Sequence, residues 1–164
     1  MHGELKHLLH WLFIAAAVWS LIAVAIPLPC LKRVWLPAFL TGFLASYPLN
    51  YLAVGSLGLW RFPPVPLTFL HTPFFLAVAW FGAMVVFDHL ILVYSRFKYL
   101  FILGFSLLST AIYAMAAIER HLRPGHWSYA EIFYLALIMH CVALYVLRLF
   151  RKDGALRPHE NPLW

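Results

Sequence analysis

Long apolar segments, separated by short stretches that hold the charged residues, dominate the pattern along this chain. A helix that crosses a bilayer needs about 20 consecutive, mainly apolar residues. The segments lack the alternation of apolar and polar positions that is typical of membrane β-barrels. The pattern therefore predicts five membrane-spanning helices, at residues 8–28, 36–59, 73–94, 99–118 and 129–150.

The composition supports an all-α integral membrane protein, because 64% of the residues are hydrophobic and only 11% are charged. Soluble proteins are about half apolar and about a quarter charged. The composition excludes a water-soluble enzyme, a disordered chain, a nucleic-acid-binding domain and a secreted disulfide scaffold. The first segment is too long for a signal peptide and no Ala-x-Ala site follows it, so we expect a retained helix. We expect residues 1–150 to form one bundle and residues 151–164 a basic tail.

Lys and Arg residues are unequally divided between the two predicted sides of the membrane. Four lie in the N-terminal segment and the two longer loops, and eight lie in the two short loops and around the tail. Short cytoplasmic loops carry the excess of basic residues in membrane proteins. The sequence therefore predicts a multi-pass protein of the cell membrane, with the N-terminus outside and the C-terminus in the cytoplasm.

Local signals mark irregularities and ends of the predicted helices. Pro48 lies inside the second segment, where it removes an N–H donor and favours a kink, and Asn50 follows it. Thr72-Pro73 is typical of a helix start, with a cap residue before a first-turn proline. Ser128 and Glu131 have the spacing of a capping box at the start of the last helix.

Asp88, followed by His89, is the strongest candidate for a functional group. A carboxylate inside a membrane is costly, so it normally pairs with a cation or serves an ion or ligand pathway. A structural salt bridge to Arg96, Lys98 or Arg151 and a functional role remain equally open.

His140 lies near the middle of the last predicted helix. An imidazole there can act as a proton relay, a haem ligand or a hydrogen-bonding group between helices. We favour the structural hydrogen bond. With Asp88, His89 and Asn50, His140 completes the candidate ligand or proton pathway.

Several histidines fall on the predicted outer side. His7 and His10 are three residues apart and therefore share a helix face. With a third ligand from His121, His126 or Glu119 they form a candidate zinc or copper site. Anchoring at the membrane interface is the simpler interpretation, because no known metal-binding motif is present.

The loop at residues 60–72 contains Trp60, Phe62 and three prolines. Such a loop either covers a cavity as a lid or places its aromatic rings at the headgroups of the lipids. We favour the aromatic belt, which is common in membrane proteins.

A series of short motifs resembles a family of small, uncharacterised multi-pass membrane proteins of spore-forming bacteria. The resemblance covers residues 58–147 and begins with Gly58-Leu59-Trp60-Arg61-Phe62-Pro63. It continues with Phe87-Asp88, with Tyr94 before a basic turn, and with Trp127-Ser128-Tyr129. The resemblance implies a five-helix bundle in the cell membrane and no particular activity.

Three functions remain open, and the sequence identifies no cofactor. The first, which we favour, is a non-enzymatic accessory subunit that associates with other membrane proteins or with itself. The second is a transporter or binding protein for a small molecule or ion that uses Asp88 and the kink at residues 48–50. The third is a redox subunit that holds haem or a metal. Besides the lipid bilayer, the sequence names no partner, and it has no basic run typical of nucleic-acid binding.

Overall fold

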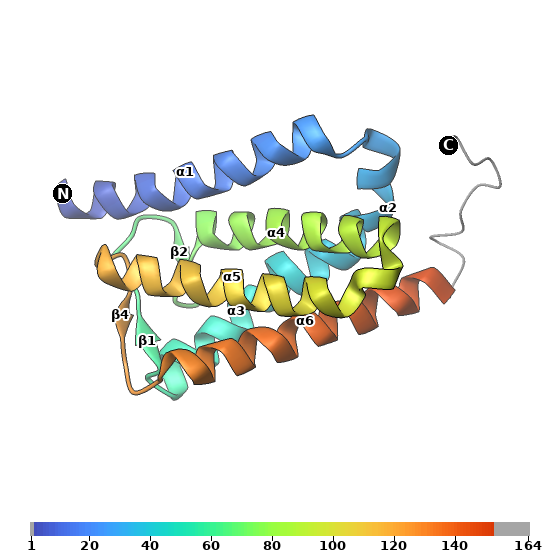
Figure 1. The fold of residues 1–164 in the computed structure, drawn as a ribbon. Helices are drawn as coiled ribbons and strands as arrows, with labels where there is room; N and C mark the ends of the chain where they lie inside the picture. Colours follow the sequence, from blue (N-terminus) through green and yellow to red (C-terminus); the bar gives the residue numbers. More distant parts are fainter. Residues whose placement is uncertain (1, 153–164) are drawn as a thin grey trace.

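The computed structural model describes residues 2–152, which form an elongated bundle of helices (Figure 1). Four regular helices run nearly the full length of the bundle: α1 (His2–Ala25), α4 (Phe74–Val93), α5 (Lys98–Ile118) and α6 (Tyr129–Lys152). The fifth segment is composite, with α2 (Leu28–Ala38), the π-helix η1 (Phe39–Leu44), α3 (Ala45–Asn50) and the π-helix η2 (Tyr51–Ser56) in direct succession. The five predicted helical segments are confirmed; the predicted tail lies, from residue 153 on, outside the described residues.

The start of the second segment differs from the prediction. We expected a loop before residue 36, whereas α2 begins at Leu28 and includes Lys32 and Arg33. Pro27 precedes the helix with φ −58° and ψ 140°, and Pro29 lies in its first turn. Proline fits a first helical turn because its φ is already helical and the N–H that it lacks would have no partner there. The chain therefore re-enters a helix almost directly after α1.

The composite segment is irregular on both sides of Pro48. Backbone N–H groups at Ala45 and Leu57 donate to carbonyls five residues earlier, at Leu40 and Leu52, which is the π-helical pattern. Pro48 cannot donate a backbone hydrogen bond. The segment therefore widens where the sequence predicts a kink.

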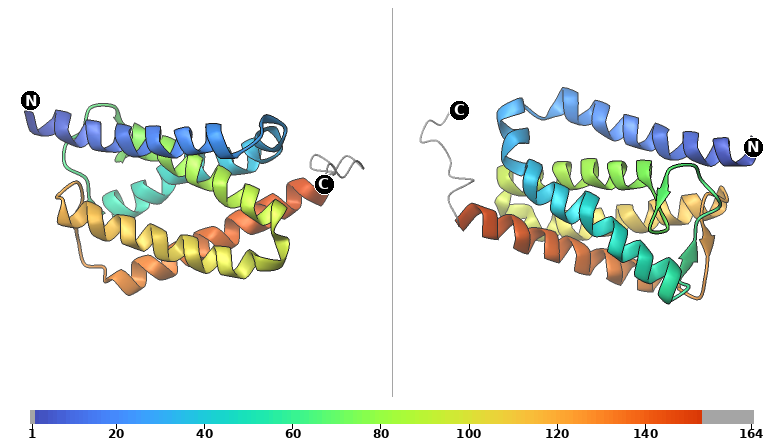
Figure 2. Two further views of the ribbon diagram at one scale, coloured as in Figure 1. Left: turned by 45° about the horizontal axis from the view of Figure 1, so that its top comes forward. Right: turned by 180° about the vertical axis from the view of Figure 1, so that it is seen from behind.

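Helix α4 lies at the centre of the bundle and packs against α1, α2, η1, α5 and α6 (Figure 2). Half of its 20 residues are buried. The connection before α4 differs from the prediction, because the Thr72 side chain does not cap the helix. Thr72 instead donates to the Ser46 and Leu70 carbonyls, and α4 begins after Pro73 without a side-chain cap.

Two short antiparallel strand pairs close the end of the bundle that holds the N-terminus. Strand β1 (Trp60–Arg61) pairs with β4 (Arg123–Pro124), and β2 (Thr68–Phe69) pairs with β3 (Thr72–Pro73). The second pair turns through Leu70 and His71, both with positive φ. A two-residue turn with positive φ at both positions, the type I′ turn, usually has Asn and Gly there. Leu and His therefore make this turn hard to recognise from the sequence.

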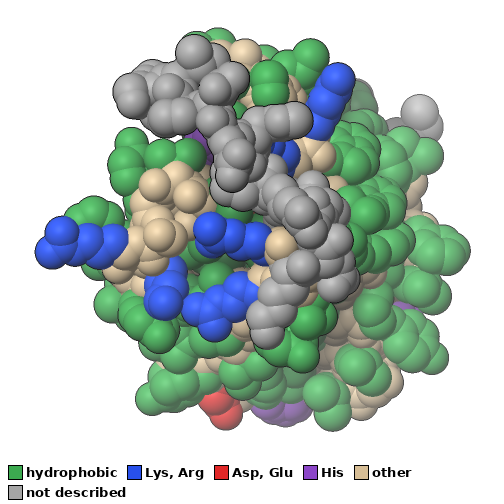
Figure 3. All heavy atoms as spheres, turned by 90° about the vertical axis from the view of Figure 1, so that its right-hand side faces the viewer, with side chains coloured by type: hydrophobic (Ala, Val, Ile, Leu, Met, Phe, Trp, Pro, Cys, Tyr) green, Lys and Arg blue, Asp and Glu red, His purple; other side chains and the backbone are tan. Residues whose placement is uncertain are grey.

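Four helical spans, within residues 4–25, 74–93, 95–118 and 129–151, are long and apolar enough to cross a membrane. Large apolar side chains cover much of the exterior, including Phe13, Val24 and Ile118. Lys and Arg side chains gather at the end opposite the N-terminus (Figure 3). Arg96, Lys98, Arg148 and Arg151 surround a hollow there.

Gly42 allows the composite segment to approach α4 closely. A Cβ atom at this position would lie 2.8 Å from both the Phe81 Cα and the Trp80 carbonyl oxygen. We expect Gly42→Ala to lower the free energy of unfolding by about 1–3 kcal/mol, because backbone atoms must shift. Gly104→Ala is the matched control, since a Cβ atom at that position would have no neighbouring atom within 4 Å. Equal stability of the two variants, measured by reversible unfolding in detergent, would contradict this interpretation.

Candidate functional site

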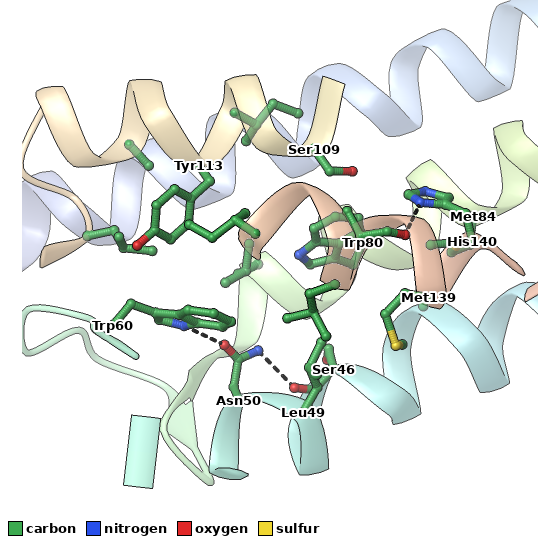
Figure 4. A pocket seen from close by; sticks show the side chains of 18 of the residues that line it. Ser46, Leu49, Asn50, Trp60, Trp80, Met84, Ser109, Tyr113, Met139 and His140 are labelled. Carbon is green, nitrogen blue, oxygen red and sulfur yellow. Dashed lines mark hydrogen bonds between the residues drawn. The ribbon is translucent and has the colours of Figure 1, made fainter. Parts of the chain in front are cut away.

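A pocket of about 120 Å³ lies among the helices, and we call it the central pocket (Figure 4). Every helical segment contributes to its lining, from Trp11 in α1 to His140 in α6. Its walls are mainly aromatic and aliphatic, with Trp60, Trp80 and Tyr113 among the larger side chains. Apolar pockets with a few polar groups that converge are typical small-molecule sites.

Asn50 and Trp60 form the polar wall on the side of the composite segment. The Trp60 Nε1–H donates to Asn50 Oδ1 at 3.1 Å, and Asn50 Nδ2 donates to the Ser46 carbonyl at 2.8 Å (Figure 4). Trp60 is only 7% exposed and packs edge-on against Tyr113. The prediction of an aromatic belt is therefore wrong for Trp60, because its polar N–H has a partner inside the bundle.

His140 lines the pocket from α6 and is almost completely buried. Its Nδ1 lies 2.7 Å from the Ala136 carbonyl oxygen and 3.3 Å from Ser106 Oγ on α5. A carbonyl can only accept, so Nδ1 carries the proton and the neutral ring has its lone pair at Nε2. His140 therefore both contacts a neighbouring helix and leaves one acceptor free.

Three buried polar atoms of the pocket residues have no hydrogen-bond partner among the described residues. They are Trp11 Nε1 from α1, Tyr113 Oη from α5 and His140 Nε2 from α6. A buried polar group without a partner costs about 1–3 kcal/mol. All three groups belong to residues that line the same pocket, and each would gain free energy from a hydrogen-bond partner.

Asp88 and His89 do not belong to this pocket. Asp88 is completely buried in α4, and neither carboxylate oxygen has a hydrogen-bond partner among residues 2–152. The salt bridge that we considered to Arg96, Lys98 or Arg151 is not formed within this part of the chain. Of the four predicted pathway residues, the structure therefore brings together only Asn50 and His140.

A second polar cluster lies where α1 meets the turn after α5. His10 Nδ1 and His121 Nε2 lie 3.5 and 3.6 Å from Glu119 Oε2. His7 Nδ1 lies 2.8 Å from His121 Nδ1, so one ring donates a hydrogen bond to the other. The structure thus assembles His7, His10, Glu119 and His121, which we call the histidine cluster. His126 is exposed and is not one of its members.

Burial keeps the His121 imidazole neutral at pH 7. It lowers the pKa of this group from the usual 6.5 to about 4, and the neighbouring His10 and His7 rings act in the same direction. Glu119 has the opposite, weaker influence. A neutral imidazole is the form that binds metal ions.

Ser128 and Glu131 make the reciprocal hydrogen bonds of a capping box at the start of α6. The Ser128 N–H donates to Glu131 Oε2 at 2.7 Å, and the Glu131 N–H donates to Ser128 Oγ at 3.4 Å. These bonds satisfy two backbone groups at the helix end. Both residues therefore have a structural role that positions α6, and with it His140.

Sequence reasoning missed Trp11 and Tyr113 as pocket residues. Both carry a polar atom on a large apolar ring, and such residues normally find a partner when they are buried. Tyr113 follows Ser109 at helical spacing, and both line the pocket. The spacing shows a shared face but not that this face points inward, so the sequence alone did not single them out.

The Asn50–Trp60 hydrogen bond gives a direct test of the pocket wall. We expect Asn50→Ala to lower the free energy of unfolding by about 1–3 kcal/mol, because it leaves the buried Trp60 N–H without a partner. In a double-mutant cycle with Trp60→Phe, the two losses should be less than additive. Strict additivity of unfolding free energies in detergent would show that the two side chains do not interact.

Comparison with known proteins adds no functional assignment to this geometry. No family model, curated protein or solved structure matches the chain. The resemblance to small membrane proteins of spore-forming bacteria therefore stays a prediction, and the function has to be argued from the two polar sites of the bundle.

Proposed function

We propose that this chain is a multi-pass membrane protein that binds a small, mainly apolar molecule in the central pocket. The observation that carries the proposal is the set of three buried polar atoms, on Trp11, Tyr113 and His140, that have no partner within residues 2–152. They come from three different helices, α1, α5 and α6. Packing alone does not account for them, because an empty pocket leaves each desolvation cost without compensation.

The lining also limits the chemistry of the ligand. The Trp11 N–H needs an acceptor, and the His140 Nε2 lone pair needs a donor. The Tyr113 hydroxyl can pair with a donor or with an acceptor. An apolar cavity of about 150 Å³ holds a benzene-sized molecule, so about 120 Å³ suits a molecule of that size or smaller. A small molecule with one hydroxyl or N–H group and one carbonyl or ether oxygen meets the polar requirements.

The membrane setting of the proposal rests on the length and apolar character of the helices. The proposed orientation rests on the basic side chains at the end opposite the N-terminus (Figure 3). By the positive-inside rule this end belongs in the cytoplasm. The histidine cluster then lies on the outer side.

Reporter fusions test this orientation. A reporter that works only in the cytoplasm should be active when it is attached after Trp164, because the adjacent end of the bundle carries most of the Lys and Arg residues. The matched fusion before Met1 should be active only on the outside. The opposite result for both fusions would invert every assignment of sides.

Native mass spectrometry of protein gently extracted from its own membrane tests the ligand. We expect an additional mass in the range of a small organic compound. Ala136→Leu should lower the occupied fraction at least tenfold, because its larger side chain fills the pocket. Ala111→Leu, the same change at an exposed position of α5, should retain full occupancy.

Tyr113→Phe distinguishes binding from a purely structural role. Removing a buried hydroxyl that has no partner among the described residues should stabilise the empty protein by about 1–3 kcal/mol, and it should also weaken ligand binding. A wild-type chain with no bound mass, or with a haem mass that Ala136→Leu does not displace, would contradict the proposal. A central pocket that holds only ordered water would also give a wild-type chain with no bound mass.

A further inference from the structure

We propose that His10, Glu119 and His121 form a binding site for a divalent transition-metal ion, with zinc as the simplest occupant. The site lies where α1 meets the turn after α5. It is separate from the central pocket, and the proposal does not depend on what that pocket binds.

The distances within the histidine cluster match those around a tetrahedral ion. Zinc binds imidazole nitrogen and carboxylate oxygen at about 2.0–2.2 Å, which places tetrahedral ligand atoms roughly 3.3–3.6 Å apart. The two nitrogen–carboxylate distances here are 3.5 and 3.6 Å. All three candidate ligand atoms lie within 4.8 Å of one another. One ion can therefore reach all three without a backbone movement.

Both rings must rotate before they can bind one ion. The His10 and His121 imidazoles are stacked, with 3.6 Å between their centroids and 13° between their planes. Metal binding uses a lone pair in the plane of each ring, so both rings must tilt toward the carboxylate. The outer torsion of a histidine side chain is broad and allows this change at low cost.

His7 is placed to orient His121 rather than to bind the ion. Its Nδ1 atom lies 2.8 Å from His121 Nδ1, whereas the other nitrogen of the His121 ring, Nε2, faces Glu119. When Nε2 holds a metal, Nδ1 carries the proton and donates to His7. Metal-binding histidines almost always make such an outer hydrogen bond, which fixes the tautomer and the ring orientation.

Burial and access also suit a metal ion. The His121 side chain is 4% exposed and the His10 side chain 21%, whereas Glu119 is 47% exposed. One side of the cluster thus stays open, so an ion can enter and water can occupy a fourth position. Glu119 supplies the negative charge of the site, which opposes the positive charges of Lys6 and Arg123 that act on His7.

A metal ion here would link parts of the chain that are distant in sequence. His7 and His121 are 114 positions apart, and α1 otherwise packs mainly against α4. The ion would therefore link the N-terminal helix to the turn that leads to β4.

Zinc binding to the full-length chain tests the proposal. The protein is prepared in detergent without a polyhistidine tag, stripped with a chelator and titrated with zinc against a chromophoric competitor. We expect one zinc ion per chain, with affinity at least 100-fold weaker for His10→Ala and His121→Ala. His7→Ala should weaken it about 10–100-fold, as outer hydrogen-bond partners do. His71→Ala and His126→Ala are the matched controls and should bind as the wild type does.

Folding is controlled by comparing the thermal unfolding of each metal-free variant with that of the wild type. Glu119→Gln keeps the shape of a half-exposed side chain, so its loss of affinity reports the missing charge. Ala136→Leu should bind zinc normally, which separates this site from the central pocket. Absence of stoichiometric zinc in the wild type, or equal losses in His126→Ala and His10→Ala, would overturn the proposal and leave the cluster as a set of interhelical hydrogen bonds.

Discussion

The need to satisfy backbone polar groups inside an apolar bundle governs the composite segment, and the rest of the structure depends on it. Pro37 and Pro48 both lie inside its helices, where they cannot donate backbone hydrogen bonds. Side chains donate hydrogen bonds to backbone carbonyls along this segment: Thr41 donates to the Pro37 carbonyl, and Asn50 donates to the Ser46 carbonyl. Where no water is available, irregular backbone survives only with such internal partners.

The side chains that donate to carbonyls of the composite segment also shape the central pocket. Thr41, Ser46 and Asn50 satisfy the composite segment and also line the pocket. Asn50 then holds Trp60 in place, at the start of the strand that pairs with β4. Strand β4 begins two residues after His121. A continuous series of contacts therefore leads from the irregular helix, through the pocket wall, to the histidine cluster.

The two polar sites differ in what they lack. Around the central pocket, single polar atoms without partners among the described residues come from separate helices, and the proposed binding of a small organic molecule rests on them. In the histidine cluster, imidazoles and one carboxylate already contact each other, an arrangement typical of metal coordination. Asp88 belongs to neither site, and the structure gives its buried carboxyl group no partner within the described residues.

The sequence by itself determined the five helical segments, the irregularity around Pro48 and the basic end of the bundle. These features depend on hydropathy, proline chemistry and charge, which act over a few neighbouring residues. The prediction was nevertheless wrong at Leu28, where a helix begins. Pro29 is typical of a first helical turn, but the apolar residues around it made this helix start hard to recognise.

Only the tertiary structure decided which polar side chains meet. It turned Trp60 into the bundle rather than toward the lipid headgroups, and it joined His10 to Glu119 and His121 while leaving His126 apart. The physical reason is that such contacts depend on how far each helix is rotated and how closely it approaches its neighbours. Close contacts such as that of Gly42 with α4 set this geometry, and no local pattern in the sequence records it.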